Sequence, residues 1–211
     1  MKYNKIEKLF ESLKVPEALS DESQIVPIKT VYKSIDVVAR LKCFNCGLYC
    51  RAILCPPYLF QTYPQFKSYK STKEWIKTFD AAILFIWKND GSKSWTIDPG
   101  KLSHLELKPK FGKQLKGTET SQSREMCRLT AKYRAIARKT FSEAFGLING
   151  HCDLCAFKCP NRDNPPCKKG GMPSLEAIGI DVYRLYTMLG IEYEYPVETY
   201  LTLSTMLLIK E

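Results

Sequence analysis

The sequence predicts a single α+β domain in which helices cover a mixed or antiparallel β-sheet. Two segments give the clearest strand signal: 81–87 is apolar on both faces, and 200–209 is almost continuously apolar or β-branched. Amphipathic helices are expected at 123–145 and 174–189, because apolar side chains recur there at helical spacing. The 211 residues suffice for one well-buried core, so we treat 1–211 as one domain.

The N-terminal part begins with a predicted helix and continues through a segment with mixed signals. Residues 4–13 place apolar side chains on one helical face, and we interpret 1–24 as a helical extension. Residues 25–38 are rich in β-branched side chains, which favour a strand; a short helix leading into Arg40 is the alternative. Helical character returns at 67–79. This part of the chain therefore predicts helices on either side of a partly extended segment.

A long segment without a regular pattern follows the first clear strand. Residues 89–122 are rich in lysine and in turn-forming dipeptides, which predicts a long inserted loop. Further on, Gly146 is expected to end one helix and Gly190 the other, because glycine readily adopts the left-handed conformation that ends helices. A short strand is expected at 191–195, before the last strand.

Eight of the nine cysteines fall into two short groups. The first cysteine motif covers residues 43–57 and ends in Cys-Pro-Pro; the second covers 150–167, with a proline directly after its third cysteine. Thiolates crowded in this way form a soft set of ligands that selects zinc or an iron–sulfur cluster. The candidate ligands are Cys43, Cys46, Cys50 and Cys55 in the first motif and Cys152, Cys155, Cys159 and Cys167 in the second.

The spacing in the second motif favours iron–sulfur over zinc. An all-cysteine zinc site usually joins two Cys-x2-Cys pairs across a longer insertion, whereas this motif has three cysteines in quick succession. Cys159-Pro160 is similar to the cysteine–proline ending of bacterial ferredoxin motifs. We therefore expect one or two 4Fe-4S clusters, with zinc as the alternative and unmetallated thiols as the remaining interpretation.

Two further side chains bear on the chemistry of these motifs. Cys127 stands alone within a predicted helix, so we expect a buried core thiol that binds no metal. Tyr49 lies inside the first motif and could donate a hydrogen bond or a proton, although packing on the metal centre is the commoner role for such a tyrosine. Catalytic residues are otherwise not indicated, because the sequence has no Ser-His-Asp set, phosphate loop or dinucleotide fingerprint.

The net charge and the composition limit which binding partners and which cellular compartment are expected. The net charge of +10 favours an acidic partner: a redox protein, a nucleic acid or an anionic membrane surface. No run of apolar residues is long enough to span a membrane, and the first residues do not resemble a signal peptide. We therefore expect a cytoplasmic protein, in which thiols stay reduced and metal explains the grouped cysteines better than disulfides do.

Both cysteine motifs resemble those of a family of unknown function whose members are predicted metal-binding proteins, found mostly in anaerobic bacteria and archaea. The resemblance runs from about Arg40 to the C-terminus, and two multi-cysteine motifs in the same order make it specific. It implies metal or iron–sulfur binding. The matching residues are Cys43-x2-Cys46-x2-Tyr49 and Cys55-Pro56-Pro57, then Gly150-x-Cys152-x2-Cys155-x3-Cys159, Pro166-Cys167 and Pro173-Ser174-Leu175-Glu176-Ala177.

The chain departs from that family pattern at two positions. Cys50 stands where the family has a glycine, which offers a possible fourth thiol to the first motif. His151 stands where the family has proline or another small residue, which places an imidazole beside Cys152. Both departures leave the ligand sets of the two centres open.

Three functions compete at this point. The first is a redox protein that passes electrons to a partner through fully ligated clusters. The second is an enzyme: if only Cys43, Cys46 and Cys55 bind the first cluster, one iron can bind sulfide or substrate as a Lewis acid. The third is a zinc-stabilised binding module for nucleic acid or an acidic protein partner, although aromatic and basic residues do not interleave as a base-stacking surface requires.

Overall fold

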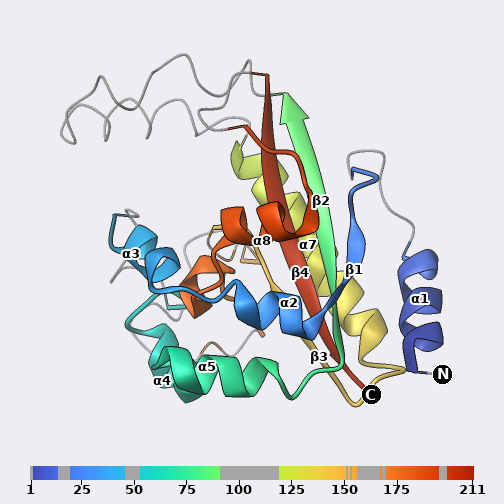
Figure 1. Cartoon of the computed structure of the whole chain (residues 1–211), viewed down its shortest axis with the longest axis horizontal. Helices are drawn as coiled ribbons and strands as arrows, with labels where there is room; N and C mark the ends of the chain where they lie inside the picture. The colour runs from blue at the N-terminus through green and yellow to red at the C-terminus, as the bar shows by residue number, and fades with distance from the viewer. Residues whose placement is uncertain are drawn as a thin grey trace.

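The computed structural model of the chain describes residues 2–13, 20–45, 53–90, 119–150, 152, 154–155, 167, 170–194 and 199–211. It confirms the predicted α+β class. Figure 1 shows a four-stranded sheet with helices on both sides of it. The strand order is β1-β2-β4-β3, and every neighbouring pair is antiparallel. Within the described residues, no helix combines the length and the apolar character that crossing a membrane requires.

The two strands predicted most clearly form the centre of the sheet. The pair runs from Ala81 opposite Ile209 to Asp90 opposite Tyr200. Each of these two strands also pairs with an outer strand, so its backbone is bonded on both sides and its side chains are covered on both faces. The strands are β1 (Gln24–Pro27), β2 (Ala81–Asp90), β3 (Glu143–Leu147) and β4 (Tyr200–Lys210).

The helices account for most of the remaining described residues. Only four residues of the segment 25–38 and its flank form a strand, whereas 28–33 and 37–38 are helical, so the helix leading into Arg40 is confirmed. The helices are α1 (Lys2–Ser12), α2 (Ile28–Lys33), α3 (Val37–Asn45), α4 (Leu59–Thr62), α5 (Tyr69–Ile76), α7 (Glu119–Ala137) and α8 (Val182–Leu189), with short 3-10 turns η1 (Pro64–Phe66) and η4 (Glu176–Ile178).

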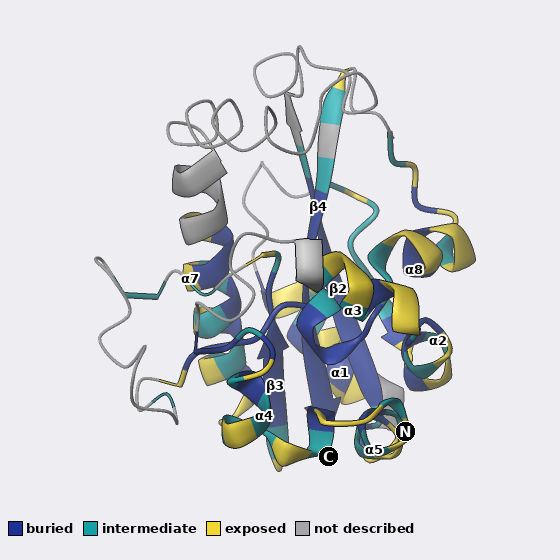
Figure 2. Cartoon of the chain, turned by 90° about the vertical axis from the view of Figure 1, so that its left-hand side faces the viewer, coloured by how far each residue is buried: buried dark blue, intermediate teal, exposed yellow. Residues whose placement is uncertain are grey.

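The sheet separates two apolar cores, because successive side chains of a strand point to opposite faces. On β2, Ala82, Leu84 and Ile86 join the core that is covered by α2, α5 and α8. Ile83 and Phe85 of the same strand join the core that is covered by α1 and α7. The two predicted covering helices therefore lie on opposite faces of the sheet, and the buried strands run between them in Figure 2.

The helix predicted at 123–145 is wrong at its C-terminal end. α7 ends at Ala137, and Ala144 and Phe145 belong to β3, where they lie opposite Ile209 and Leu208. Pairing with the free edge of β4 satisfies these backbone groups better than a longer helix would. Gly146 does not end a helix either; it lies in β3 against Met172, so close that a Cβ would overlap that side chain.

The helix predicted at 174–189 is divided in two. Gly179 has φ of 98°, a conformation that interrupts a helix, and Asp181 then caps the start of α8 by accepting a hydrogen bond from the Arg184 amide. Gly190 ends α8 with φ of 68°, as predicted. The strand predicted at 191–195 is wrong for its described part, since residues 191–194 belong to no strand.

The predicted inserted loop at 89–122 falls mostly on residues 91–118, which lie outside the described residues. Its two ends are regular: residues 89–90 extend β2, and residues 119–122 begin α7. β2 therefore extends beyond the predicted strand 81–87, and α7 begins before the predicted helix 123–145.

Candidate metal centre

The structure describes part of each cysteine motif. From the first motif it describes Cys43 and Cys55, and from the second Cys152, Cys155 and Cys167, all half-buried. Outside the described residues lie the predicted ligands Cys46, Cys50 and Cys159, together with Tyr49 and His151.

A short parallel bridge closes the segment that carries the second motif. The amide of Ile148, just after β3, donates to the carbonyl of Pro173 at 3.0 Å. The amide of Leu175 donates to the carbonyl of Ile148 at 3.2 Å, which completes a bridge between Ile148 and Ser174. The sheet therefore fixes both ends of this segment, although they are far apart in sequence.

The thiols of Cys152 and Cys167 converge on Gly171. The Sγ of Cys167 lies 3.1 Å, and that of Cys152 3.4 Å, from the position that a Cβ would occupy on this glycine. Two cysteines at the start and the end of the second motif are thus brought to one point. Thiolates in this arrangement can both bind one metal ion or one cluster. The absence of a side chain on Gly171 leaves room for the sulfur atoms.

The first cysteine motif reaches this point through Leu54. The Cδ1 of Leu54 lies 2.5 Å from the same Cβ position on Gly171, and the side chain is 4% exposed. Because Leu54 directly precedes Cys55, the two motifs contact each other.

Arg134 of α7 lies beside the converging thiols. Its Nη2 donates a hydrogen bond of 2.6 Å to the carbonyl of Gly170, the residue before Gly171. Burial lowers the pKa of Arg134, and the nearby Arg138 lowers it further, whereas Tyr63 and Cys152 act in the opposite direction. A guanidinium is thus held in a partly desolvated position next to the second motif.

Tyr63 completes the surroundings of these thiols. Burial raises the pKa of its hydroxyl, Arg134 opposes this effect, and Cys167 and Cys152 add to it. Its ring packs edge-on against Phe145 at 5.4 Å between centroids. The phenol therefore stays protonated over the ordinary pH range and remains able to donate a hydrogen bond.

Cys127 is buried, as predicted, with 1% exposure. Its position was not predicted: it packs with Ile148 and Met172 in a cluster that Cys152 also contacts. Cys127 and Arg134 are seven residues apart on α7 and therefore share one helix face. That spacing is the sequence signal that could have placed both residues beside the second motif.

Arg40 plays a comparable part near Cys43. The two residues are three apart on α3 and lie on the same side of the helix. The Arg40 guanidinium donates to the carbonyl of Lys67 at 3.2 Å and to Thr72 Oγ1 at 3.1 Å, and it also bonds the carbonyl of Phe66. The Cζ atom of Arg40 lies 4.4 Å from the centre of the Tyr69 ring on α5. Burial lowers the pKa of Arg40, while Cys43 acts in the opposite direction.

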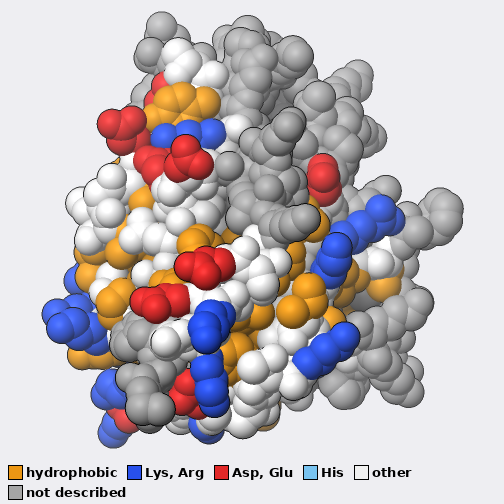
Figure 3. Space-filling view, turned by 90° about the vertical axis from the view of Figure 1, so that its right-hand side faces the viewer, with side chains coloured by type: hydrophobic (Ala, Val, Ile, Leu, Met, Phe, Trp, Pro, Cys, Tyr) orange, Lys and Arg blue, Asp and Glu red, His pale blue; other side chains and the backbone are white. Residues whose placement is uncertain are grey.

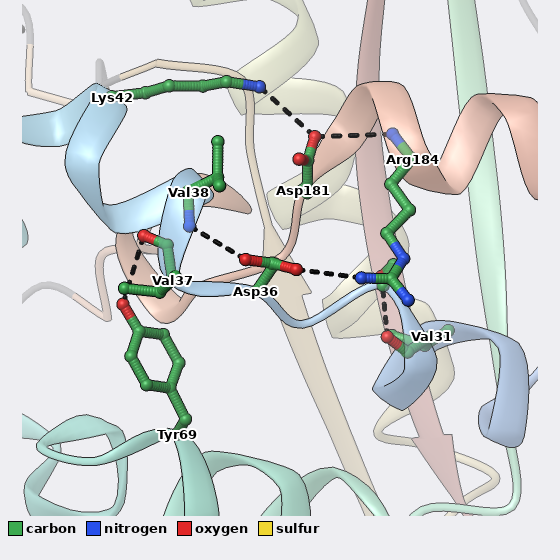
Figure 4. Close-up of polar contacts among 9 residues, drawn as sticks. Val31, Asp36, Val37, Val38, Lys42, Tyr69, Asp181 and Arg184 are labelled. Carbon is green, nitrogen blue, oxygen red and sulfur yellow. Dashed lines mark hydrogen bonds and ion pairs between the residues drawn. The ribbon is translucent and has the colours of Figure 1, made fainter.

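Ion pairs fix the position of α3, which carries Cys43. Asp36 accepts from the Val38 amide at 3.0 Å and pairs with Arg184 of α8 at 2.8 Å. Lys42 pairs with Asp181 at 3.2 Å, directly before α8 (Figure 4). The start of the first motif is therefore tied to the same part of the chain that closes the second.

The backbone reinforces this connection. Ile35 and Ile180 form an antiparallel bridge, in which the Asp36 amide donates to Gly179 and the Asp181 amide donates to Ser34, each at 2.9 Å. We call residues 172–181 the strap. Near its start the strap hydrogen-bonds Ile148, just before the second motif. Near its end it hydrogen-bonds Ser34 and Asp36, just before the helix that carries Cys43.

The described side chains alone do not complete a metal site. Among them, no group of three or more histidines, cysteines and acids is arranged to hold a metal ion. The structure brings together Cys152 and Cys167 of the four predicted ligands of the second motif, while Cys159 lies outside the described residues. At this candidate site, tertiary contacts therefore bring together two cysteine thiols and one neighbouring guanidinium.

The face of the molecule in Figure 3 gives no support to a nucleic-acid interface in its described part. On the face shown in Figure 3, the described basic side chains are interspersed with acidic and apolar ones and form no continuous basic patch. Phosphate binding along a nucleic acid requires clustered lysines and arginines.

Comparisons with known proteins agree with the chemistry of the two motifs. No curated protein and no solved structure gives a significant match to the chain. A family model does match, over residues 25–209, which include both cysteine motifs and all four strands apart from the first residue of β1 and the last of β4. The chain belongs to this family, which is described as predicted metal-binding protein (DUF2284).

Proposed function

We propose that the protein is an iron–sulfur protein whose second cysteine motif holds a 4Fe-4S cluster. The observation that carries the proposal is the convergence of the Cys152 and Cys167 thiols at Gly171. The crowded spacing of the four cysteines and the proline after Cys159 favour this cluster over zinc. Membership of a metal-binding family supports a bound metal without deciding which one.

The residues around the thiols fit such a group. Gly171 provides space at the sulfur atoms, and Leu54 covers them with apolar surface that limits the access of water. Arg134 supplies positive charge beside thiolates that would carry negative charge. When bound, the cluster supplies one-electron redox chemistry, whose potential depends on charge, hydrogen bonds and solvent exposure.

The first motif is proposed to hold a second centre through Cys43, Cys46 and Cys55, with Cys50 as the possible fourth ligand. Full thiolate ligation there favours electron transfer with an acidic redox partner in the cytoplasm. Ligation by three thiols favours small-molecule redox or sulfur chemistry at the remaining coordination position. The contact of Leu54 with Gly171 supports two neighbouring centres.

The test is anaerobic purification followed by measurement of iron, acid-labile sulfide and zinc per chain. We expect iron and sulfide in equal amounts, and a broad visible absorption band that bleaches on reduction. The single substitution Cys152→Ser should remove the metal of the second centre, whereas Cys127→Ala serves as the matched control. Stoichiometric zinc without sulfide would contradict the proposal and favour a zinc-stabilised binding module.

A further inference from the structure

Two half-buried arginines have no acidic partner among the described residues. Neither Arg40 nor Arg134 forms an ion pair with any described aspartate or glutamate. Other basic side chains in the described part of the chain do have such partners: Lys42 pairs with Asp181, and Arg184 pairs with Asp36. Further described basic side chains, such as Arg128 and Lys132, also lack such a partner, but these are exposed to water, whereas Arg40 and Arg134 are half-buried.

Leaving a buried positive charge unpaired is costly, because it loses hydration without gaining an opposite charge. Burial accordingly lowers the pKa of both guanidinium groups. A side chain kept in such a position is expected to face negative charge from another source.

For Arg134, the nearest candidate source is the pair of thiols at Gly171. The guanidinium bonds the carbonyl of Gly170 at 2.6 Å, and the thiols of Cys152 and Cys167 converge on the next residue. A cluster or metal ion held by several thiolates carries net negative charge. The positive group therefore lies where that charge would be placed.

For Arg40, the candidate source is Cys43, one helical turn further along α3. Carbonyl and hydroxyl oxygens bond the two terminal nitrogens, but Nε is buried without a hydrogen-bond partner among the described residues. Neutral oxygens and the rings of Phe60 and Tyr69 position this guanidinium, and none of these groups carries a negative charge. One half-buried arginine therefore lies near each cysteine motif.

We propose that Arg134 and Arg40 are the counter-ions of the metal centres at the second and the first cysteine motif, and that they set the reduction potential of these centres. The inference rests on the function proposed above. Reduction adds negative charge to a centre, so a neighbouring guanidinium favours the reduced form. Removal of either positive charge should make its centre harder to reduce.

The test compares Arg134→Gln with Arg134→Lys and with the control Arg138→Gln. Arg138 is an exposed residue directly after α7 that donates a hydrogen bond to the carbonyl of Ala144. For each anaerobically loaded protein, midpoint potentials are measured by redox titration, and iron and sulfide are quantified. We expect a lower potential for one centre in Arg134→Gln, a smaller decrease in Arg134→Lys and no change in Arg138→Gln. Arg40→Gln should lower the potential of the other centre, and Arg40→Lys should lower it less.

The possible failures can be told apart. If the parent protein contains no iron and sulfide, the proposed function is wrong, and the inference falls with it. If the parent is loaded and both Arg134 variants keep its potentials, the counter-ion role is wrong while the proposed function stands. If Arg134→Gln does not fold, Arg134→Met decides, because it also removes the charge: a lowered potential supports the role, and an unchanged one overturns it.

Discussion

Leu54 lies directly against Gly171, and this contact joins the two cysteine motifs. The Leu54 Cδ1 atom is 2.5 Å from the position that a Cβ would occupy on the glycine, and two thiols lie within 3.4 Å of that position. Gly171 does not have a positive φ, so its backbone would accept other residues. The requirement for glycine here is therefore one of space at the candidate metal centre.

Substitution of Gly171 by alanine should impair the second centre. The added methyl group would overlap Leu54 and crowd the Cys167 thiol, so we expect less bound metal and a lower Tm. The combination of Gly171→Ala with Leu54→Ala restores space and should recover part of the metal content. Full metal loading and an unchanged Tm in the single variant would show that the contact does not matter.

Substitution of Cys127 by alanine should leave metal binding intact. The thiol is buried against Ile148 and Met172, and its removal creates a small cavity that we expect to cost about 1 kcal/mol of stability. Metal analysis and denaturant unfolding measure the two effects. Since Cys127 lies in the same cluster as Cys152, loss of one whole centre in this variant would identify Cys127 as a ligand.

Substitution of Cys50 by glycine separates the two forms of the proposed function. If three thiols hold the first centre, the variant keeps its cluster, and added cyanide or thiolate changes its spectrum as it changes that of the parent. We expect this result, because the resembling family has glycine at the position. Complete loss of the first cluster would make Cys50 a ligand and remove the main support for an enzyme.

Glu176 of η4 should make stability depend on pH. Although the residue as a whole is half-buried, burial of its carboxyl raises its pKa above the ordinary value of 4.5. The folded state then binds more protons than the unfolded state between these two values, so stability falls as pH rises through this window and levels off above it. Glu176→Gln should remove this decrease.

Urea unfolding of the parent and of Glu176→Gln at several pH values measures that difference. Glu74→Gln is the matched control, because Glu74 is exposed and pairs only with Lys77 on the surface. Parallel pH profiles for the parent and Glu176→Gln would contradict the assignment.

The central strands could be predicted from the sequence, because 81–87 is apolar on both faces and 200–209 is almost continuously apolar or β-branched, as buried strands are. β3 could not be predicted in this way. Ala144 and Phe145 continue the apolar spacing of the preceding helix, and only the free edge of β4 makes them a strand. Pairing with β4, which is distant in sequence, therefore determines that these residues form a strand.

At the candidate site, too, some features are visible in the local sequence, whereas others depend on contacts between distant residues. Cysteine is rare and chemically specific, so its spacing alone identified both motifs and their candidate ligands. Arginine is common on surfaces, and only its seven-residue spacing from Cys127 marks Arg134 before α7 is placed beside Gly170. The contact between the two motifs at Leu54 likewise depends on packing that no local pattern encodes.

The position of β4 in the sheet has a consequence for biosynthesis. This strand lies between β2 and β3, yet the ribosome makes it after every other strand. Until β4 is inserted, β2 and β3 have unpaired edges, and β3 lacks the partner that aligns the base of the second motif. Both cysteine motifs are therefore translated before the strand that completes this sheet, and we expect the site at Gly171 to form only after β4 has been inserted.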